Sequence, residues 1–157
     1  MFTRGSDMFI VIRLRGSIGA RKDIVDTLDM LNLHTSNNCV VIPEDKTHKG
    51  MLQKVRDMVT WGEADAEILA ALLKKKLRLE GGNSVESTDL KKLLNVDSFE
   101  ALASAVIDGK VKIVSPFEKT LRLRPPTKGF KSTRETYPKG DLGYRGKEIS
   151  KLLQRMI

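Results

Sequence analysis

The spacing of apolar residues between positions 8 and 63 is the feature that most constrains the fold. Residues 8–15 (MFIVIRLR) alternate with the period of two that is typical of a strand. After Gly16–Gly19, the apolar residues Ile24, Leu28 and Leu31 recur at helical spacing. The sequence therefore predicts a strand, a tight turn and an amphipathic helix in succession.

The same order of elements is then repeated once. Residues 38–42 read as a second short strand, which Pro43 ends because proline cannot continue a hydrogen-bonded ladder. A second helix carries an apolar stripe through Leu52 and Val55, and residues 59–62 can form a brief third strand. We predict an α+β fold with a βαβαβ core in which both helices cover one face of a small sheet, and we expect this core to fold on its own.

Alternation within the first strand predicts how its two faces differ. Ile10, Ile12 and Leu14 share one face, and Phe9, Val11, Arg13 and Arg15 share the other. We expect the first face to be buried and the second to be half polar.

The remaining residues divide into a helical insertion and a basic extension. Residues 64–79 are strongly helical, and two shorter helices are predicted, one over 87–94 capped by Ser87 or Thr88 and one from Ser98 to about Ile107. Residues 111–114 and 121–124 are predicted strands, residues 127–144 an extended loop, and 147–156 a docking helix with Ile149, Leu152, Leu153 and Met156 on its apolar face. We predict three parts, a core over 1–63, an insertion over 64–114 and an extension over 115–157.

Charge is distributed unevenly along the chain. Residues 1–118 hold 17 Lys and Arg against 17 Asp and Glu, whereas residues 119–157 hold 11 against 3, so the whole net charge of +8 lies in residues 119–157. Lys and Arg that displace counterions from phosphates make such a segment typical of a nucleic-acid-binding arm.

Several other classes of function are not expected. The single cysteine, Cys39, cannot form an internal disulfide, and His34 and His48 stand too far apart in sequence to suggest a metal site. Asp23, Asp26 and Asp29 are more typical of a solvated strip near a helix start than of a metal site. We expect no catalytic residue, cofactor, metal, membrane contact or small-molecule substrate, and a cytoplasmic location.

The candidate site is an RNA interface. The turn before Arg21 and Lys22 could place these cations at a phosphate or be an ordinary turn, and the sequence leaves both open. Tyr144 lies among the cations of the extension, where a ring can stack on a base or lie against a sugar. The predicted RNA-binding residues are Arg13, Arg15, Arg21, Lys22, Lys49, Arg122, Arg124, Lys128, Lys131, Arg134, Lys139, Tyr144 and Arg145.

Two sets of motifs resemble a known family. The first set is Met30-Leu-Asn-Leu-His34, Asn38-Cys-Val-Val-Ile-Pro43, Lys49-Gly-Met-Leu52 and Trp61-Gly-Glu63; it is similar to the universal thirty-class large-subunit ribosomal proteins. The second set is Leu121-Arg-Leu-Arg-Pro-Pro126, Lys128-Gly-Phe130 and Tyr137-Pro-Lys-Gly-Asp-Leu-Gly-Tyr-Arg-Gly146, which resembles the archaeal and eukaryotic branch, whose eukaryotic members form the L-seven family. The short N-terminus fits the archaeal form better, and bacterial relatives are similar only over residues 8–63.

The resemblance implies more than the pattern does. It implies a ferredoxin-like, three-stranded antiparallel sheet with the first strand central and two helices on one face. It also implies a structural role in the large ribosomal subunit, bound to rRNA near the central protuberance, beside other ribosomal proteins and with 5S rRNA as a candidate neighbour.

One alternative function remains, a DNA-binding regulator. The helices within residues 87–108, followed by Lys110–Val114, could form a helix-turn-helix with a wing. The second of these helices carries Glu100 and Asp108 and no Lys or Arg before Lys110, which is unfavourable for a recognition helix.

Overall fold

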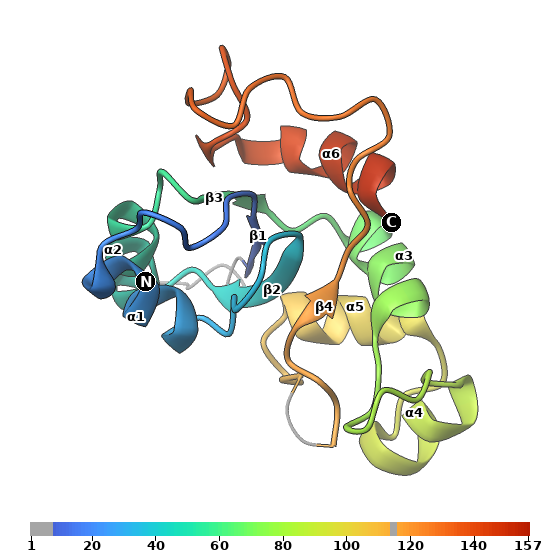
Figure 1. Ribbon diagram of the computed structural model, residues 1–157. Helices are drawn as coiled ribbons and strands as arrows, with labels where there is room; N and C mark the ends of the chain where they lie inside the picture. The colour runs from blue at the N-terminus through green and yellow to red at the C-terminus, as the bar shows by residue number, and fades with distance from the viewer. Residues whose placement is uncertain (1–7, 114–115) are drawn as a thin grey trace, which may run out of the picture.

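A five-stranded sheet with the order β4-β2-β1-β3-β5 forms the centre of the protein. The computed structural model describes residues 8–113 and 116–157. The predicted α+β class is confirmed, with helices on both sides of the sheet (Figure 1). The strands are β1 Met8–Arg13, β2 Asn38–Pro43, β3 Val59–Glu63, β4 Leu121–Arg122 and β5 Gly143–Tyr144.

Strand β1 is central, as the family resemblance implies. It pairs antiparallel with β2, with Ile10 opposite Val41, and antiparallel with β3, with Val11 opposite Trp61. The sheet is wider than the expected three strands, because the extension adds one short strand at each edge. Strand β4 pairs antiparallel with β2, and β5, which lies within the predicted loop, pairs parallel with β3.

Two helices, α1 (Lys22–Met30) and α2 (Lys46–Lys54), cover one face of the sheet, as predicted. They lie together on the same side of the strands in Figure 1. Leu28 and Leu52 are fully buried there against Phe9, Val11 and other strand residues. The helical spacing in the sequence thus located the apolar faces correctly.

The opposite face of the sheet, with Ile10, Ile12 and Leu14, is buried, as the alternation within β1 predicted. Helices α3 (Ala66–Lys76), α5 (Phe99–Ile107) and α6 (Ile149–Met156) pack with Ile10, Ile12 and Leu14 in a second apolar cluster. The predicted docking face of α6 is confirmed, because its four apolar residues are buried. The prediction of a half-polar second face was wrong on the side of α1 and α2, where Phe9, Val11 and Arg13 are buried and only Arg15 is exposed.

Smaller elements follow the predictions less closely. Ser98 Oγ accepts from the backbone N of Ala101, which confirms that cap, whereas α4 (Ser87–Leu94) is capped by Glu86 and not by Ser87 or Thr88. Glu86 N donates to Asp89 Oδ2 at 3.1 Å. Residues 111–113 form no strand, and Val114 lies outside the described residues. Residues Gly146–Glu148 form the 3-10 turn η1.

Packing joins all three predicted parts. The second apolar cluster takes residues from 8–63, from 64–113 and from 116–157, so residues 8–63 alone would leave Ile10, Ile12 and Cys39 without cover. This is a physical reason against independent folding of the core. We nevertheless keep the three-part division as a proposal about organisation along the chain.

Gly62 explains how the extension reaches the sheet. A Cβ on this residue would lie 2.0 Å from the carbonyl oxygen of Gly146 and 3.0 Å from the Cβ of Ile149. Only glycine allows β3 and η1 to approach this closely.

Helix α1 offers a direct test of this packing. Leu28→Asp places a carboxylate in the cluster beneath α1 and α2, so we expect the free energy of unfolding to fall by about 3 kcal/mol or more. Met30→Asp lies on the same helix with a side chain that is 66% exposed, and it is the matched control. Denaturant unfolding should separate the two variants, and equal stability of both would reject the assigned helix face.

Candidate RNA interface

Strand alternation turns two predicted RNA-binding arginines outward. From Leu121 to Arg124 the apolar side chains are buried and Arg122 and Arg124 are exposed. The backbone N of Leu123 donates to the carbonyl oxygen of Asn37, and that of Arg124 donates to Met156. The backbone that carries both arginines is therefore hydrogen-bonded to Asn37 before β2 and to Met156 at the end of α6.

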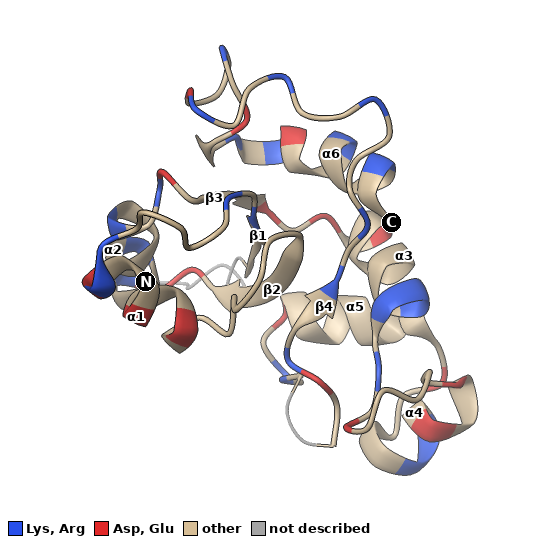
Figure 2. Ribbon diagram, in the orientation of Figure 1, with Lys and Arg blue, Asp and Glu red and all other residues tan. Residues whose placement is uncertain are grey.

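The loop after β4 presents four further cations. Lys128, Lys131, Arg134 and Lys139 are all exposed. Figure 2 shows Lys and Arg spaced along this arm, above α6. Asp141 organises the loop, because its Oδ2 accepts from the backbone N of Lys131 and, at 3.2 Å, from that of Ser132.

Arg145 is buried, although the sequence placed it among the phosphate ligands. Only 7% of the residue is exposed. Its Nη2 donates to the carbonyl oxygen and to Oδ1 of Asp141, both at 2.9 Å, and its Nε donates to Thr60 Oγ1 at 3.0 Å. We call Arg145, Asp141 and Thr60 the anchor network. The segment 141–145 thus folds back into the core, although the sequence predicted an extended loop over residues 127–144.

Arg13 is buried as well. It is 1% exposed, and its guanidinium donates to Leu33 O at 2.7 Å, Arg15 O at 2.8 Å and Ser17 Oγ at 2.6 Å. Burial lowers its pKa, and Asp29 acts against that shift. These bonds hold the Gly16–Gly19 turn against the end of α1. We leave Arg13 and Arg145 out of the interface for this reason.

The other N-terminal candidates are exposed but partly engaged within the protein. Arg15 donates to Asp57 O at 3.3 Å, and Arg21 lies 3.3 Å from Asp23 Oδ2. Lys22 is exposed at the first position of α1. Lys49 lies 2.5 Å from Glu44 Oε1.

Tyr144 shares a hollow of about 340 Å³ with Lys49. Its ring packs 6.3 Å from that of Trp61 and 6.5 Å from that of Phe9, and its hydroxyl donates to Glu63 Oε1. The residue is 52% exposed, so one side of the ring is available to a partner.

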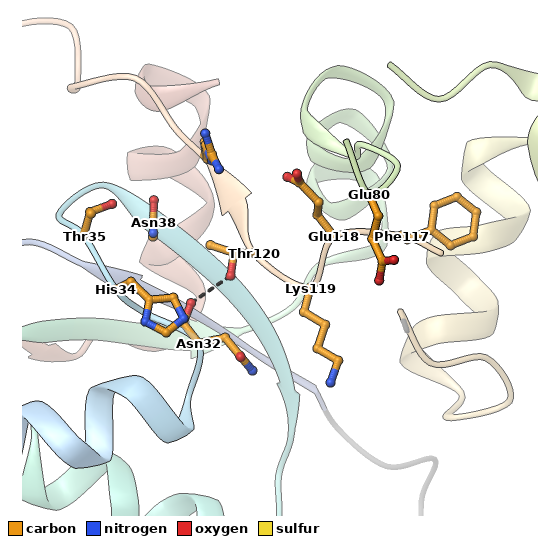
Figure 3. Close-up of a pocket in the computed structure, with 10 residues that line it drawn as sticks. Asn32, His34, Thr35, Asn38, Glu80, Phe117, Glu118, Lys119 and Thr120 are labelled. Atoms are coloured by element: carbon orange, nitrogen blue, oxygen red, sulfur yellow. Dashed lines mark hydrogen bonds between the residues drawn. The ribbon is translucent and has the colours of Figure 1, made fainter. Parts of the chain in front are cut away.

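A groove separates the start of β2 from the segment before β4 (Figure 3). Asn32, His34, Thr35 and Asn38 lie on one side and Glu80, Phe117 and Glu118 on the other, with Thr120 Oγ1 donating to Asn32 O at 2.8 Å. Two cations, Lys119 and Arg122, line the groove together with these two carboxylates, so its charges balance.

Comparison with known proteins identifies the family. Residues 9–59 match the family described as Ribosomal protein L30p/L7e. Proteins named "Large ribosomal subunit protein uL30" are similar over nearly the whole chain. The one from Archaeoglobus fulgidus is 42% identical, covering 95% of this chain and 99% of its own length. The protein from Methanosphaera stadtmanae is 43% identical, covering 96% of this chain and 100% of its own length. The protein from Thermoplasma volcanium is 42% identical, covering 96% of this chain and 93% of its own length.

The chain belongs to the L30p/L7e family. Its similarity to these relatives confirms the resemblance to the archaeal form. The family consists of structural ribosomal proteins, so this L30p/L7e chain is not an enzyme.

Local chemistry agrees with a non-enzymatic member of L30p/L7e. Burial of Cys39 raises the pKa of its thiol, which disfavours the reactive thiolate. His34 Nδ1 lies 3.2 Å from Asp29 Oδ1 on the surface. The described residues contain no group of three metal-binding side chains and no helix with the length and apolarity to span a bilayer.

Helix α5 does not serve as a recognition helix in this L30p/L7e chain. Leu102, Ala103 and Val106 are buried in the second apolar cluster, and the exposed side includes Glu100 and Ser104. The DNA-binding alternative has no cationic surface on this helix.

Two groups of residues were missed in the sequence. Lys75, Lys76 and Arg78 were read only as part of a helical block, although four cations within residues 74–78 are a visible signal. Thr60 carried no local signal, because its partner Arg145 is distant from it in sequence. Asp141 lies only four residues before Arg145, and this spacing was a signal that went unused.

Removal of Arg145 tests the anchor network. Arg145→Ala leaves Asp141 buried without its cation, and we expect a loss of about 3–5 kcal/mol in the free energy of unfolding. Lys139→Ala removes an equal charge from the same loop and should leave thermal melting unchanged. If both variants melt as the wild type does, Arg145 is not a structural residue and the original assignment to phosphate regains support.

Tyr144 offers a pH test. The hydrogen bond to Glu63, with smaller effects of burial and nearby charge, raises its pKa from 10.0 to about 12. Because the folded-state pKa is the higher one, the neutral phenol stabilises the fold below pH 10, and this contribution is lost as the pH rises through 12.

Absorbance titration of phenolate measures this pKa. Tyr137→Phe leaves Tyr144 as the single tyrosine and keeps a ring beneath Arg145. We expect titration near 12 in this variant and at a lower pH when Glu63→Gln is added. An identical titration in both backgrounds would show that Glu63 does not hold the hydroxyl.

Proposed function

We propose that this chain binds rRNA as a structural constituent of the large ribosomal subunit in the cytoplasm. The observation that carries the proposal is a set of exposed cations along the extension that have no carboxylate partner within 4.0 Å among the described residues. They are Arg122, Arg124, Lys128, Lys131, Arg134 and Lys139. The name shared by its relatives, "Large ribosomal subunit protein uL30", supports the same assignment.

Absence of local ion pairs favours phosphate as the ligand. Elsewhere on the surface, Lys49 pairs with Glu44 and Lys151 with Glu148. Cations without such partners repel one another and gain more when they release counterions from a polyanion. Direct contacts to phosphates would fix the position of the protein on folded RNA.

Tyr144 supplies a different kind of contact. With its hydroxyl held by Glu63, the ring is fixed while about half of the residue stays exposed. A fixed ring can lie against a base or a ribose at low entropic cost. Lys49 in the same hollow, and Arg15, Arg21 and Lys22 at the turn before α1, remain candidate phosphate contacts.

Further partners belong to the same proposal. Neighbouring ribosomal proteins and the region of the central protuberance, with 5S rRNA as a candidate, follow from the family resemblance alone. The loop 127–140 should gain order on the RNA, where charge neutralisation offsets the entropy of ordering.

Salt dependence tests the phosphate contacts. Lys128→Ala with Lys139→Ala should weaken binding to large-subunit rRNA and reduce the log–log salt slope by about 1.4 to 1.8 units. Lys92→Ala with Lys112→Ala removes the same charge from exposed sites outside the extension and is the control.

The two variants give distinct outcomes. If the slope falls equally in both, only net charge matters and the extension is not the interface. Tagged wild-type protein should also sediment with the large subunit, and its confinement to the free-protein fractions of a gradient would contradict the proposed function.

A further inference from the structure

The end of α3 brings cations toward β4 from a distant part of the sequence. Helix α3 ends with Lys74, Lys75 and Lys76, and Leu77 then adopts an extended backbone with φ −65° and ψ 131°. Leu77 is buried and Arg78 is exposed, the alternation expected of an extended chain. Arg78 thus faces solvent for the same reason as Arg122 and Arg124.

Backbone pairing fixes this approach. Leu79 pairs with Phe117 in an antiparallel bridge, and the backbone N of Glu118 donates to Arg78 O at 2.8 Å. The chain then runs from residue 118 directly into β4. Residues 78–80 are therefore held beside the segment that delivers Arg122.

The side chains meet on one surface. Arg78 and Arg122 line a recess of about 420 Å³ together with Gly81, Gly82 and Glu118. Burial lowers the pKa of Lys76, and so do Arg124, Arg78 and Lys75 through charge repulsion. Figure 2 shows the basic end of α3 beside β4. We name this surface the α3–β4 cation cluster, made of Lys75, Lys76, Arg78, Arg122 and Arg124.

Lys74 does not belong to the cluster. It lines a different groove, which also contains Glu67, Asp97 and Glu100. Consecutive helix positions point about 100° apart, so neighbouring lysines can face different surroundings.

Helix electrostatics explain only part of the cluster. Lysines in a last helical turn interact favourably with the negative end of the helix dipole, which accounts for Lys75 and Lys76. The dipole gives no reason for Arg78 beyond the helix end, or for Arg122 and Arg124 at β4, to join them. None of the five has an ion-pair partner in residues 8–113 and 116–157, and Glu118 is the one carboxylate that lines the recess.

We propose that the α3–β4 cation cluster binds the phosphate backbone of folded RNA, an inference that rests on the proposed RNA-binding function. Cations from two separate segments form a broad positive surface rather than a pocket for one small anion. This surface adjoins the extension through Arg122 and Arg124, so one RNA segment can follow both. The helical insertion then contributes to binding as well as to the core.

A double substitution on one helical turn tests the proposal. Lys75→Gln with Lys76→Gln should lower the log–log salt slope for binding to large-subunit rRNA by about 1.4 to 1.8 units. Lys74→Gln with Lys92→Gln changes the charge equally outside the cluster and should keep the wild-type slope. Melting midpoints equal to that of the wild type in both variants would show that the fold is intact.

Three results would overturn the inference. A wild-type slope for Lys75→Gln with Lys76→Gln, while Lys128→Ala with Lys139→Ala still lowers it, rejects the cluster and leaves the proposed function standing. A wild-type slope combined with loss of incorporation into the large subunit assigns the cluster to an acidic protein neighbour. Failure of the wild type to bind rRNA rejects both the inference and the proposed function.

Discussion

The buried contact between Arg145 and Asp141 is the interaction on which the basic extension depends. Arg145 reaches Thr60 on β3, and Thr60 Oγ1 donates to Gly143 O at 2.8 Å, so β5 is held at the sheet edge. The other oxygen of Asp141 binds the backbone of the loop that carries the exposed cations. Removal of one partner from a buried pair of this kind strongly destabilises the fold, because the remaining charge is left buried without a counter-ion or solvating water.

This arrangement gives a mainly structural role to the motif from Tyr137 to Gly146, which is the most specific motif in the chain. In the string from Tyr137 to Gly146, Gly140 lies where a Cβ would be 2.1 Å from Glu135 O, and Leu142 and Arg145 are buried. Most of its residues therefore fold the loop and dock it. The phosphate ligands that we propose lie mainly in the less distinctive cations around the motif, which need charge and exposure rather than one backbone shape.

Much of the fold could be predicted because it rests on local periodicity. Apolar spacing located β1, α1, α3 and α6, and turn residues located their ends. Contacts between distant segments leave no such trace, which is why strand β5 and the buried state of Arg13 and Arg145 were missed. The sequence does not show whether a Lys or Arg side chain contacts a carbonyl group, a carboxylate or water. Arg122, Arg124 and the loop cations are exposed, whereas Arg13 and Arg145 are buried, and the RNA interface itself stays a prediction.

The most direct test of the account is an electron cryomicroscopy structure of the large ribosomal subunit that contains this chain. The account predicts rRNA phosphates along the loop 127–140, the outer side of β4 and the end of α3. It also predicts that Arg13 and Arg145 keep their partners within the protein. A structure in which this surface faces solvent or another protein, with RNA bound only elsewhere on the chain, would contradict it.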